Sequence, residues 1–302
     1  MKGLCAVGRA PQPLIGLNPR PRGLAVHGAS HNSVVRNHSP SLDPDILRPL
    51  GIGFSAGGLL FPYYIGVASG LQGAGVLTPD TPLAGASAGC LIAACVSAGL
   101  SEEVLMEATL RLADDCRRTG TYKNLGPHLG ATLRRVLPVD AHLTATGRVY
   151  VAVTRLEPQW QGQLLDSYDS REDLIMALLT SCHIPLYFDG RFSTNFRGAQ
   201  HFDGGLSRGN FLPVPPNCEQ SLRVCCLPTR EAQGAFGQVC CSPDTFEPYP
   251  HSFNQMVRWA LTPAPEPFLI DLVAKGKRDA QAWCAQRQPS SITGVAASPM
   301  VV

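Results

Sequence analysis

Residues 51–101 form short uncharged apolar runs that are separated by glycine-rich turns, and Asp80 is their only charged residue. Residues 82–100 are long and apolar enough to be read as a membrane-spanning helix. However, they contain three glycines and have no flanking cluster of Lys or Arg. Strands of a parallel sheet that is covered on both faces have the same uncharged character. We therefore predict buried strands and helices of an α/β fold here.

The pattern at the start of this region predicts a strand, a glycine loop and a helix. The strand covers residues 51–55, the turn covers 56–60, and the helix begins near Pro62, because proline is favoured in the first helical turn. A second strand at 81–84 leads through Ser87 into a short helix at 91–98. Adjacent parallel strands end at the same edge of a sheet, so we expect the glycine loop and the Ser87 turn to lie side by side.

Helix caps and periodicity predict the remaining elements. Ser101 is a typical N-cap, and its helix ends at Gly120. Ser170 and Asp173 form a capping box for a helix at 174–181. The other expected elements are a helix at 129–137, strands at 149–153, 164–168, 201–203 and 222–227, a loop at 234–250 and outer helices at 251–261 and 268–287.

The two ends of the chain differ in composition from its middle. Residues 1–42 contain no Asp or Glu but include five Lys and Arg residues with scattered Ser and Pro. This composition is typical of an organellar transit peptide, and equally of a disordered tail. We predict a tail at 1–48, one domain at 49–288 and a frayed end at 289–302. A transit peptide would send the protein to a chloroplast or mitochondrion; otherwise we expect a cytoplasmic or membrane-peripheral location.

Composition excludes some classes of function. A net charge of +2, with no basic run that alternates with aromatic residues, argues against nucleic acid as a partner. The 44% hydrophobic and 16% charged content fits a generous apolar core. The 11 cysteines contain no C-x-x-C motif and no zinc-like spacing with His, which favours buried reduced thiols.

The residues from Gly85 to Gly89 form a Gly-x-Ser-x-Gly motif with Ser87 at its centre. When it lies between a strand and a helix, this motif places the serine on a sharp turn with its hydroxyl exposed for nucleophilic attack. The free N–H groups of the following helix favour negative charge there. The alternative is a tight turn that merely packs a helix of small residues onto a sheet.

A serine nucleophile needs a base, and histidine is the usual one. Five histidines lie in the predicted domain, but none follows a late strand where a hydrolase triad would place it; they are His128, His142, His183, His201 and His251. We therefore do not expect a Ser-Asp-His triad.

Three elements in this order resemble the patatin-like phospholipase family. They are a glycine loop at 56–61, the Gly85–Gly89 motif, and Asp203-Gly204-Gly205 more than a hundred residues later. The run 63–69 is most similar to the subgroup of adipose triglyceride lipases and adiponutrin. The resemblance covers about residues 50–230, extending at most to 285, and implies a three-layer α/β/α fold with a central, mostly parallel sheet.

The resemblance also implies roles for individual residues. Ser87 corresponds to the nucleophile, and Asp203 to a base that accepts the serine proton directly without histidine. Gly57 and Gly58 correspond to the oxyanion donors. The family chemistry requires no metal and no other cofactor. A buried carboxylate suits this role, because partial desolvation raises its basicity.

Two features of the sequence bear on this assignment. The family loop has glycine where this chain has Phe61, so either the loop shifts and weakens the oxyanion donors, or the ring forms the wall of an acyl pocket. Asp189-Gly190 is a rival to Asp203, but Arg191 follows it where the family has a small residue.

The function expected from the resemblance is hydrolysis of carboxylic esters in acylglycerols or phospholipids through a Ser–Asp dyad and an acyl-enzyme. The alternatives are acyl transfer to another alcohol, and a catalytically weak scaffold on a lipid surface. The expected partners are a lipid substrate and a membrane or lipid-droplet surface, and the sequence indicates no particular protein partner.

Overall fold

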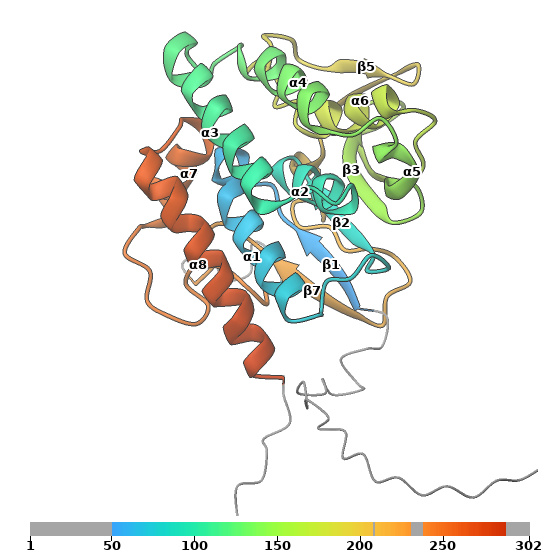
Figure 1. Ribbon diagram of the computed structural model, residues 1–302. Coiled ribbons are helices and arrows are strands. Elements are labelled where there is room, and N and C mark those ends of the chain that lie inside the picture. The colour runs from blue at the N-terminus through green and yellow to red at the C-terminus, as the bar shows by residue number, and fades with distance from the viewer. Residues whose placement is uncertain (1–49, 208, 231–237, 288–302) are drawn as a thin grey trace, which may run out of the picture. The chain divides into compact units, whose positions relative to one another are not determined.

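The computed structural model describes residues 50–207, 209–230 and 238–287 (Figure 1). The predictions for residues 1–48 and 289–302 concern parts of the chain outside these ranges. Within the described residues, no helix combines the length and the apolar character needed to cross a membrane.

A seven-stranded sheet lies at the centre, in the order β5-β6-β3-β2-β1-β7, with β4 also paired to β3. Four neighbouring strands are parallel: β7 (Gln220–Val224), β1 (Leu50–Phe54), β2 (Leu83–Ala86) and β3 (Val149–Arg155). The antiparallel strands are β4 (Gln161–Leu165), β5 (Thr194–Phe196) and β6 (Ala199–Asp203).

Helices flank this sheet, so the predicted α/β fold with a central, mostly parallel sheet is confirmed. The helices are α1 (Phe61–Gly73), α2 (Ala88–Ser97), α3 (Glu102–Thr119), α4 (Leu125–Val136), α5 (Ala141–Ala145), α6 (Arg171–Ser181), α7 (Phe253–Leu261) and α8 (Glu266–Ala285). Two 3-10 turns, η2 (Gly58–Leu60) and η3 (Gly204–Leu206), follow β1 and β6. Figure 1 shows α8 lying along α1.

Small residues set how closely the layers approach. A Cβ on Gly66 of α1 would lie 2.0 Å from the Val273 carbonyl oxygen of α8, and one on Gly276 would lie 2.2 Å from the Tyr63 oxygen. On the sheet, a Cβ on Gly53 would lie 2.1 Å from the oxygen of Pro213. The loop that contains Pro213 therefore packs against β1 at a distance that only glycine permits.

Both predicted caps are present. The side chain of Ser101 accepts a hydrogen bond from the Val104 N–H, and that of Ser170 accepts one from the Asp173 N–H. The Asp173 carboxylate accepts from the Asp169 N–H instead of completing a reciprocal box with Ser170.

Several boundaries differ from the sequence-based predictions. Strand β2 continues to Ala86 and α2 begins at Ala88, so a single residue separates them. The strand predicted at 164–168 instead covers Gln161–Leu165, because the polar, partly exposed residues at 161–163 also pair with β3. The strand predicted at 222–227 ends at Val224, where its partner β1 ends at Phe54. Strand β5 and helix α5 were not predicted, since three and five residues carry too little periodicity.

The pairing of β3 sets the positions of Ser87 and Asp203. Strand β4 occupies one edge of β3 from Val151 to Arg155, so β2 and β6 must share the other edge. Along that edge Ala86 pairs with Ala152, and Asp203 pairs with the next residue, Val153. Because β2 and β6 run in opposite directions, the residues at their ends meet.

Candidate active site

Ser87 alone makes the turn between β2 and α2. Its backbone has φ 51° and ψ −123°, a region that side-chain-bearing residues rarely adopt. A Cβ on Gly85 would lie 2.1 Å from the carbonyl carbon of Gly89, and one on Gly89 would lie 2.3 Å from the Phe54 oxygen. The two motif glycines are therefore required by close backbone contacts on both sides of the serine.

A second serine supports this turn. The Ser87 N–H donates to Ser181 Oγ at 2.9 Å, and Ser181, the last residue of α6, is fully buried. The sequence analysis did not identify Ser181 as part of the site. Its one signal is a hydroxyl at the C-terminal end of α6, which does not by itself indicate a contact 94 residues away.

Asp203 is held in place by its backbone as well as by its side chain. Its N–H donates to the His183 oxygen at 2.8 Å, and the Thr154 hydroxyl donates to the Asp203 oxygen at 2.8 Å. Its carboxylate accepts from the Gly205 N–H at 2.8 Å. A Cβ on Gly204 would lie 2.0 Å from the Ala152 oxygen, so the glycine after Asp203 lets β6 end against β3.

Asp203 is 3% exposed, and burial raises the pKa of its carboxyl group to about 7. Hydrogen bonds from the Gly205 N–H and from the Ser87 side chain lower this pKa and only partly oppose burial. The structure therefore brings Ser87 and Asp203 together and gives the carboxylate a basicity suited to accepting a proton near neutral pH.

The predicted oxyanion donors lie in the 3-10 turn after β1. Gly58 has φ 53°, and a Cβ there would lie 2.1 Å from the Ala260 oxygen, so the position requires glycine. Within the part of the chain that the structure describes, the N–H groups of Gly57 and Gly58 make no hydrogen bond. Gly58 lines the same cavity as Ser87.

Phe61 does not distort this loop. It has φ −44° and ψ −36°, ordinary helical values, and it is the first residue of α1, one position before Pro62. Its side chain lines the cavity. Of the two outcomes considered from the sequence, the structure therefore has the ring as part of the cavity wall.

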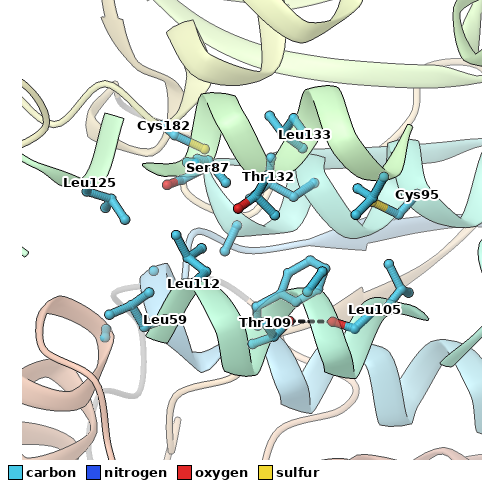
Figure 2. Close-up of a pocket in the computed structure, with 18 of the residues that line it drawn as sticks. Leu59, Ser87, Cys95, Leu105, Thr109, Leu112, Leu125, Thr132, Leu133 and Cys182 are labelled. Atoms are coloured by element: carbon cyan, nitrogen blue, oxygen red, sulfur yellow. Dashed lines mark hydrogen bonds between the residues drawn. The ribbon is translucent and has the colours of Figure 1, made fainter. Parts of the chain in front are cut away.

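The cavity beside Ser87 has a volume of about 80 Å³ and is partly open to solvent. Figure 2 shows Ser87 and Cys182 on one wall, with Leu105, Thr109 and Leu112 of α3 facing Thr132 and Leu133 of α4. None of its described lining residues is charged. An uncharged, mostly apolar lining suits an apolar ligand.

Cys182 also contacts the Ser87 side chain. A hydrogen bond with Cys90 and burial both raise the pKa of the Cys182 thiol well above its usual value, while the Ser87 side chain lowers it. The thiol therefore stays protonated at neutral pH and is not a competing nucleophile. The sequence analysis treated it only as a buried cysteine.

The remaining candidates lie elsewhere. Asp189 accepts a hydrogen bond from the Arg191 N–H at 2.9 Å and lies 3.8 Å from His183 Nε2. The side chains of Asp189 and His183 line a pocket other than the one beside Ser87. Burial lowers the pKa of His183. Among the described residues, no histidine ring forms a hydrogen bond with Ser87 or Asp203.

Comparison with known proteins agrees with the family resemblance seen in the sequence. The model of the family described as patatin-like phospholipase matches residues 53–215. The human patatin-like phospholipase domain-containing protein 4 is 32% identical over 179 residues, which cover 56% of this chain and 69% of that protein. The mouse omega-hydroxyceramide transacylase is 34% identical over 176 residues, covering 55% of this chain and 28% of the relative.

Two further proteins are similar to this chain. The human 1-acylglycerol-3-phosphate O-acyltransferase PNPLA3 is 29% identical over 174 residues, covering 54% of this chain and 35% of the relative. Among solved structures, VipD from Legionella pneumophila matches with a TM-score of 0.46 and 12% identity, covering 80% of this chain and 67% of VipD. The chain thus spans about two thirds of one curated relative and about a third of two others.

Proposed function

Since this chain belongs to the patatin-like phospholipase family, we propose that it hydrolyses carboxylic ester bonds of acylglycerols or phospholipids through Ser87 and Asp203. The observation that carries the proposal is the contact between the strained Ser87 turn and a buried carboxylate whose pKa is about 7. This pairing provides a nucleophile with a base beside it.

The geometry supports a two-step reaction. Ser87 Oγ attacks the ester carbonyl carbon as its proton passes to the Asp203 carboxylate. The tetrahedral oxyanion accepts hydrogen bonds from the free N–H groups of Gly57 and Gly58. Collapse breaks the bond to the alcohol, which leaves with the proton from Asp203. Water, deprotonated by Asp203, then attacks the acyl-serine. Collapse breaks the bond to Ser87 Oγ, which regains its proton from Asp203 as the fatty acid leaves.

A fluorophosphonate probe tests this assignment. We expect covalent labelling of the full chain, loss of labelling in Ser87→Ala, and unchanged labelling in the control Ser69→Ala, a serine of helix α1. Triacylglycerol, phospholipid and galactolipid, supplied in parallel, would then identify the substrate class. Labelling that persists in Ser87→Ala would contradict the proposal.

Acyl transfer is the second candidate, because two of the relatives are named as a transacylase and an acyltransferase. The chemistry differs only in the final step, where an acceptor alcohol replaces water at the acyl-serine. Product analysis with and without added monoacylglycerol separates the two. A catalytically weak lipid-surface scaffold, the third alternative, predicts no probe labelling.

An exposed apolar rim supports attachment to a lipid surface. We define the rim as Tyr122, Leu186 and Leu261, whose exposed fractions are 57%, 54% and 37%. All three adjoin Tyr187, which lines the cavity. The rings of Tyr122 and Tyr187 are 5.9 Å apart, Leu186 precedes Tyr187, and the Tyr187 hydroxyl donates to the Leu261 oxygen. Exposed tyrosine and leucine beside a lipid cavity suit a bilayer interface.

We propose that residues 1–48 determine where the protein resides in the cell. A transit peptide there would send it to a chloroplast or mitochondrion, and a plain tail would leave it in the cytoplasm or at a membrane surface. Imaging a fluorescent protein fused behind this segment tests it. Organellar signal is expected for a transit peptide, and diffuse signal for a plain tail.

A further inference from the structure

The cavity beside Ser87 is built from one face of each of three helices. Helix α2 contributes positions 88, 91 and 95, α3 contributes 105, 108, 109 and 112, and α4 contributes 125, 129, 132, 133 and 136. Residues three and four apart lie on one side of a helix, so each set forms a stripe along its helix axis. The cavity is therefore elongated along the helices.

Its walls are apolar over most of their length. The Thr109 hydroxyl donates to the Leu105 oxygen at 2.7 Å, so its hydrogen-bonding capacity is used within α3 (Figure 2). The Thr132 hydroxyl makes no hydrogen bond with any described residue. A wall of this composition accepts a hydrocarbon chain and excludes a charged head group, whose burial without a partner is costly.

One end of the cavity lies at a definite distance from the reacting serine. Helix α2 starts directly after Ser87, and Cys95 is eight residues further on, which corresponds to about 12 Å along the helix axis. Figure 2 shows Cys95 and Leu105 at one end of the cavity, remote from Leu59 and Leu125 at the other. Cys95 and Leu105 are 3% and 4% exposed, so packed side chains close this end.

That distance sets a chain length. An extended backbone gains about 3.6 Å per residue of three bonds, or about 1.2 Å per bond. A distance of about 12 Å thus accommodates roughly eight to ten bonds of a straight acyl chain. Each buried methylene contributes about 0.8 kcal/mol, or roughly fourfold in kcat/KM, until the chain reaches the closed end.

We propose that this cavity binds one acyl chain and that Cys95 and Leu105 limit it to about eight to ten carbons. The inference rests on the proposed ester hydrolysis at Ser87 and adds the acyl-chain class of its substrate. Medium-chain esters are then the preferred substrates, and the two end residues determine specificity without taking part in the chemistry.

A series of soluble p-nitrophenyl esters with acyl chains of increasing length tests the proposal in the full chain. We expect kcat/KM to rise roughly fourfold per added carbon and to stop rising at about eight to ten carbons. Cys95→Phe should move this limit to shorter chains, and Leu105→Ala should move it to longer ones. The control Met106→Ala, next to Leu105 but not in the cavity wall, should leave the limit unchanged.

A binding measurement separates this inference from the proposed function. Free fatty acids of the same lengths should raise the Tm of Ser87→Ala, which cannot turn over esters, up to the same limit. Adding Leu105→Ala to Ser87→Ala should extend that limit. If the fatty acids raise the Tm as expected but the wild type hydrolyses no ester, the proposed function is overturned and the acyl-chain site is not. Hydrolysis whose length limit does not move in Leu105→Ala, or rises evenly to sixteen carbons, would overturn the acyl-chain site.

Discussion

Ser87 holds a backbone conformation that serine adopts at a cost. Its φ of 51° places Cβ close to neighbouring backbone, whereas glycine adopts such angles freely. Strain of this kind persists where the surrounding structure enforces it, here through the Ser181 hydroxyl and the contacts of Gly85 and Gly89.

Ser87→Gly should therefore be more stable than Ser87→Ala, by about 1 kcal/mol or roughly 2–4 °C in Tm. Both variants should lose hydrolysis and probe labelling, because both lack the hydroxyl. Calorimetry of the two variants with the wild type checks the order. A glycine variant that melts below the alanine variant would show that the turn is unstrained.

Asp203, as the base of the proposed hydrolysis, gives that reaction a pH dependence. The carboxylate accepts a proton only when it is ionised, and its pKa is about 7, so kcat/KM should fall about tenfold per pH unit below that value. Asp203→Asn should abolish turnover, and the control Asp189→Asn should change it little. A pH–rate profile with an inflection near 4 would contradict this assignment. So would loss of turnover in a folded His183→Gln or His201→Gln variant.

The same pKa makes a prediction about stability. The folded-state pKa of about 7 lies above the unfolded value of about 3.9, so between these values the folded state binds more protons. The contribution of Asp203 to stability is present below pH of about 4 and is lost as pH rises through about 7. Asp203→Asn removes this loss. The Tm of the variant minus that of the wild type should therefore be larger at pH 8 than at pH 5. Thermal melts at the two pH values measure the difference.

At the scale of elements, close packing of α1 on α8 depends on glycine. The virtual Cβ of Gly66 lies 2.0 Å from the Val273 oxygen, which is backbone and cannot move aside alone. The last residue of α1, Gly73, has nothing within 4 Å of its virtual Cβ. One helix therefore contains both a glycine that packing requires and one that it does not.

Gly66→Ala should lower stability by about 1–3 kcal/mol through overpacking. Gly73→Ala should raise it by about 0.5–1 kcal/mol, since alanine favours the helix. Urea unfolding of both variants checks the opposite signs. Equal effects of the two substitutions on the free energy of unfolding would indicate that α1 and α8 are further apart than in this structure.

At the scale of the whole molecule, the rim of Tyr122, Leu186 and Leu261 connects the cavity to an external surface. Tyr122→Ser with Leu261→Ser should weaken flotation with phosphatidylcholine vesicles and lower hydrolysis of emulsified lipid much more than hydrolysis of a soluble short ester. Val139→Ser is the matched control, because Val139 is 80% exposed but is not part of the rim. Equal loss in the control variant would show that no particular surface binds lipid.

The sequence by itself determined the features that depend on neighbouring residues. The Ser87 turn follows from the glycines two residues to each side, because a Cβ on Gly85 would collide with the backbone of Gly89. The caps at Ser101 and Ser170 follow from hydrogen bonds within three residues. The parallel order of β1 and β2, and with it the neighbourhood of the glycine loop and Ser87, follows from the strand–loop–helix–strand pattern.

Only the tertiary structure decided what depends on contacts between distant residues. Asp189 and Asp203 both precede glycine, and the pairing of β6 on the same edge of β3 as β2 brings Asp203 to Ser87. The support from Ser181, the pKa near 7 and the cavity between α2, α3 and α4 likewise arise from segments tens of residues apart. Local propensities do not encode such contacts, because long-range pairing and burial are properties of the packed molecule.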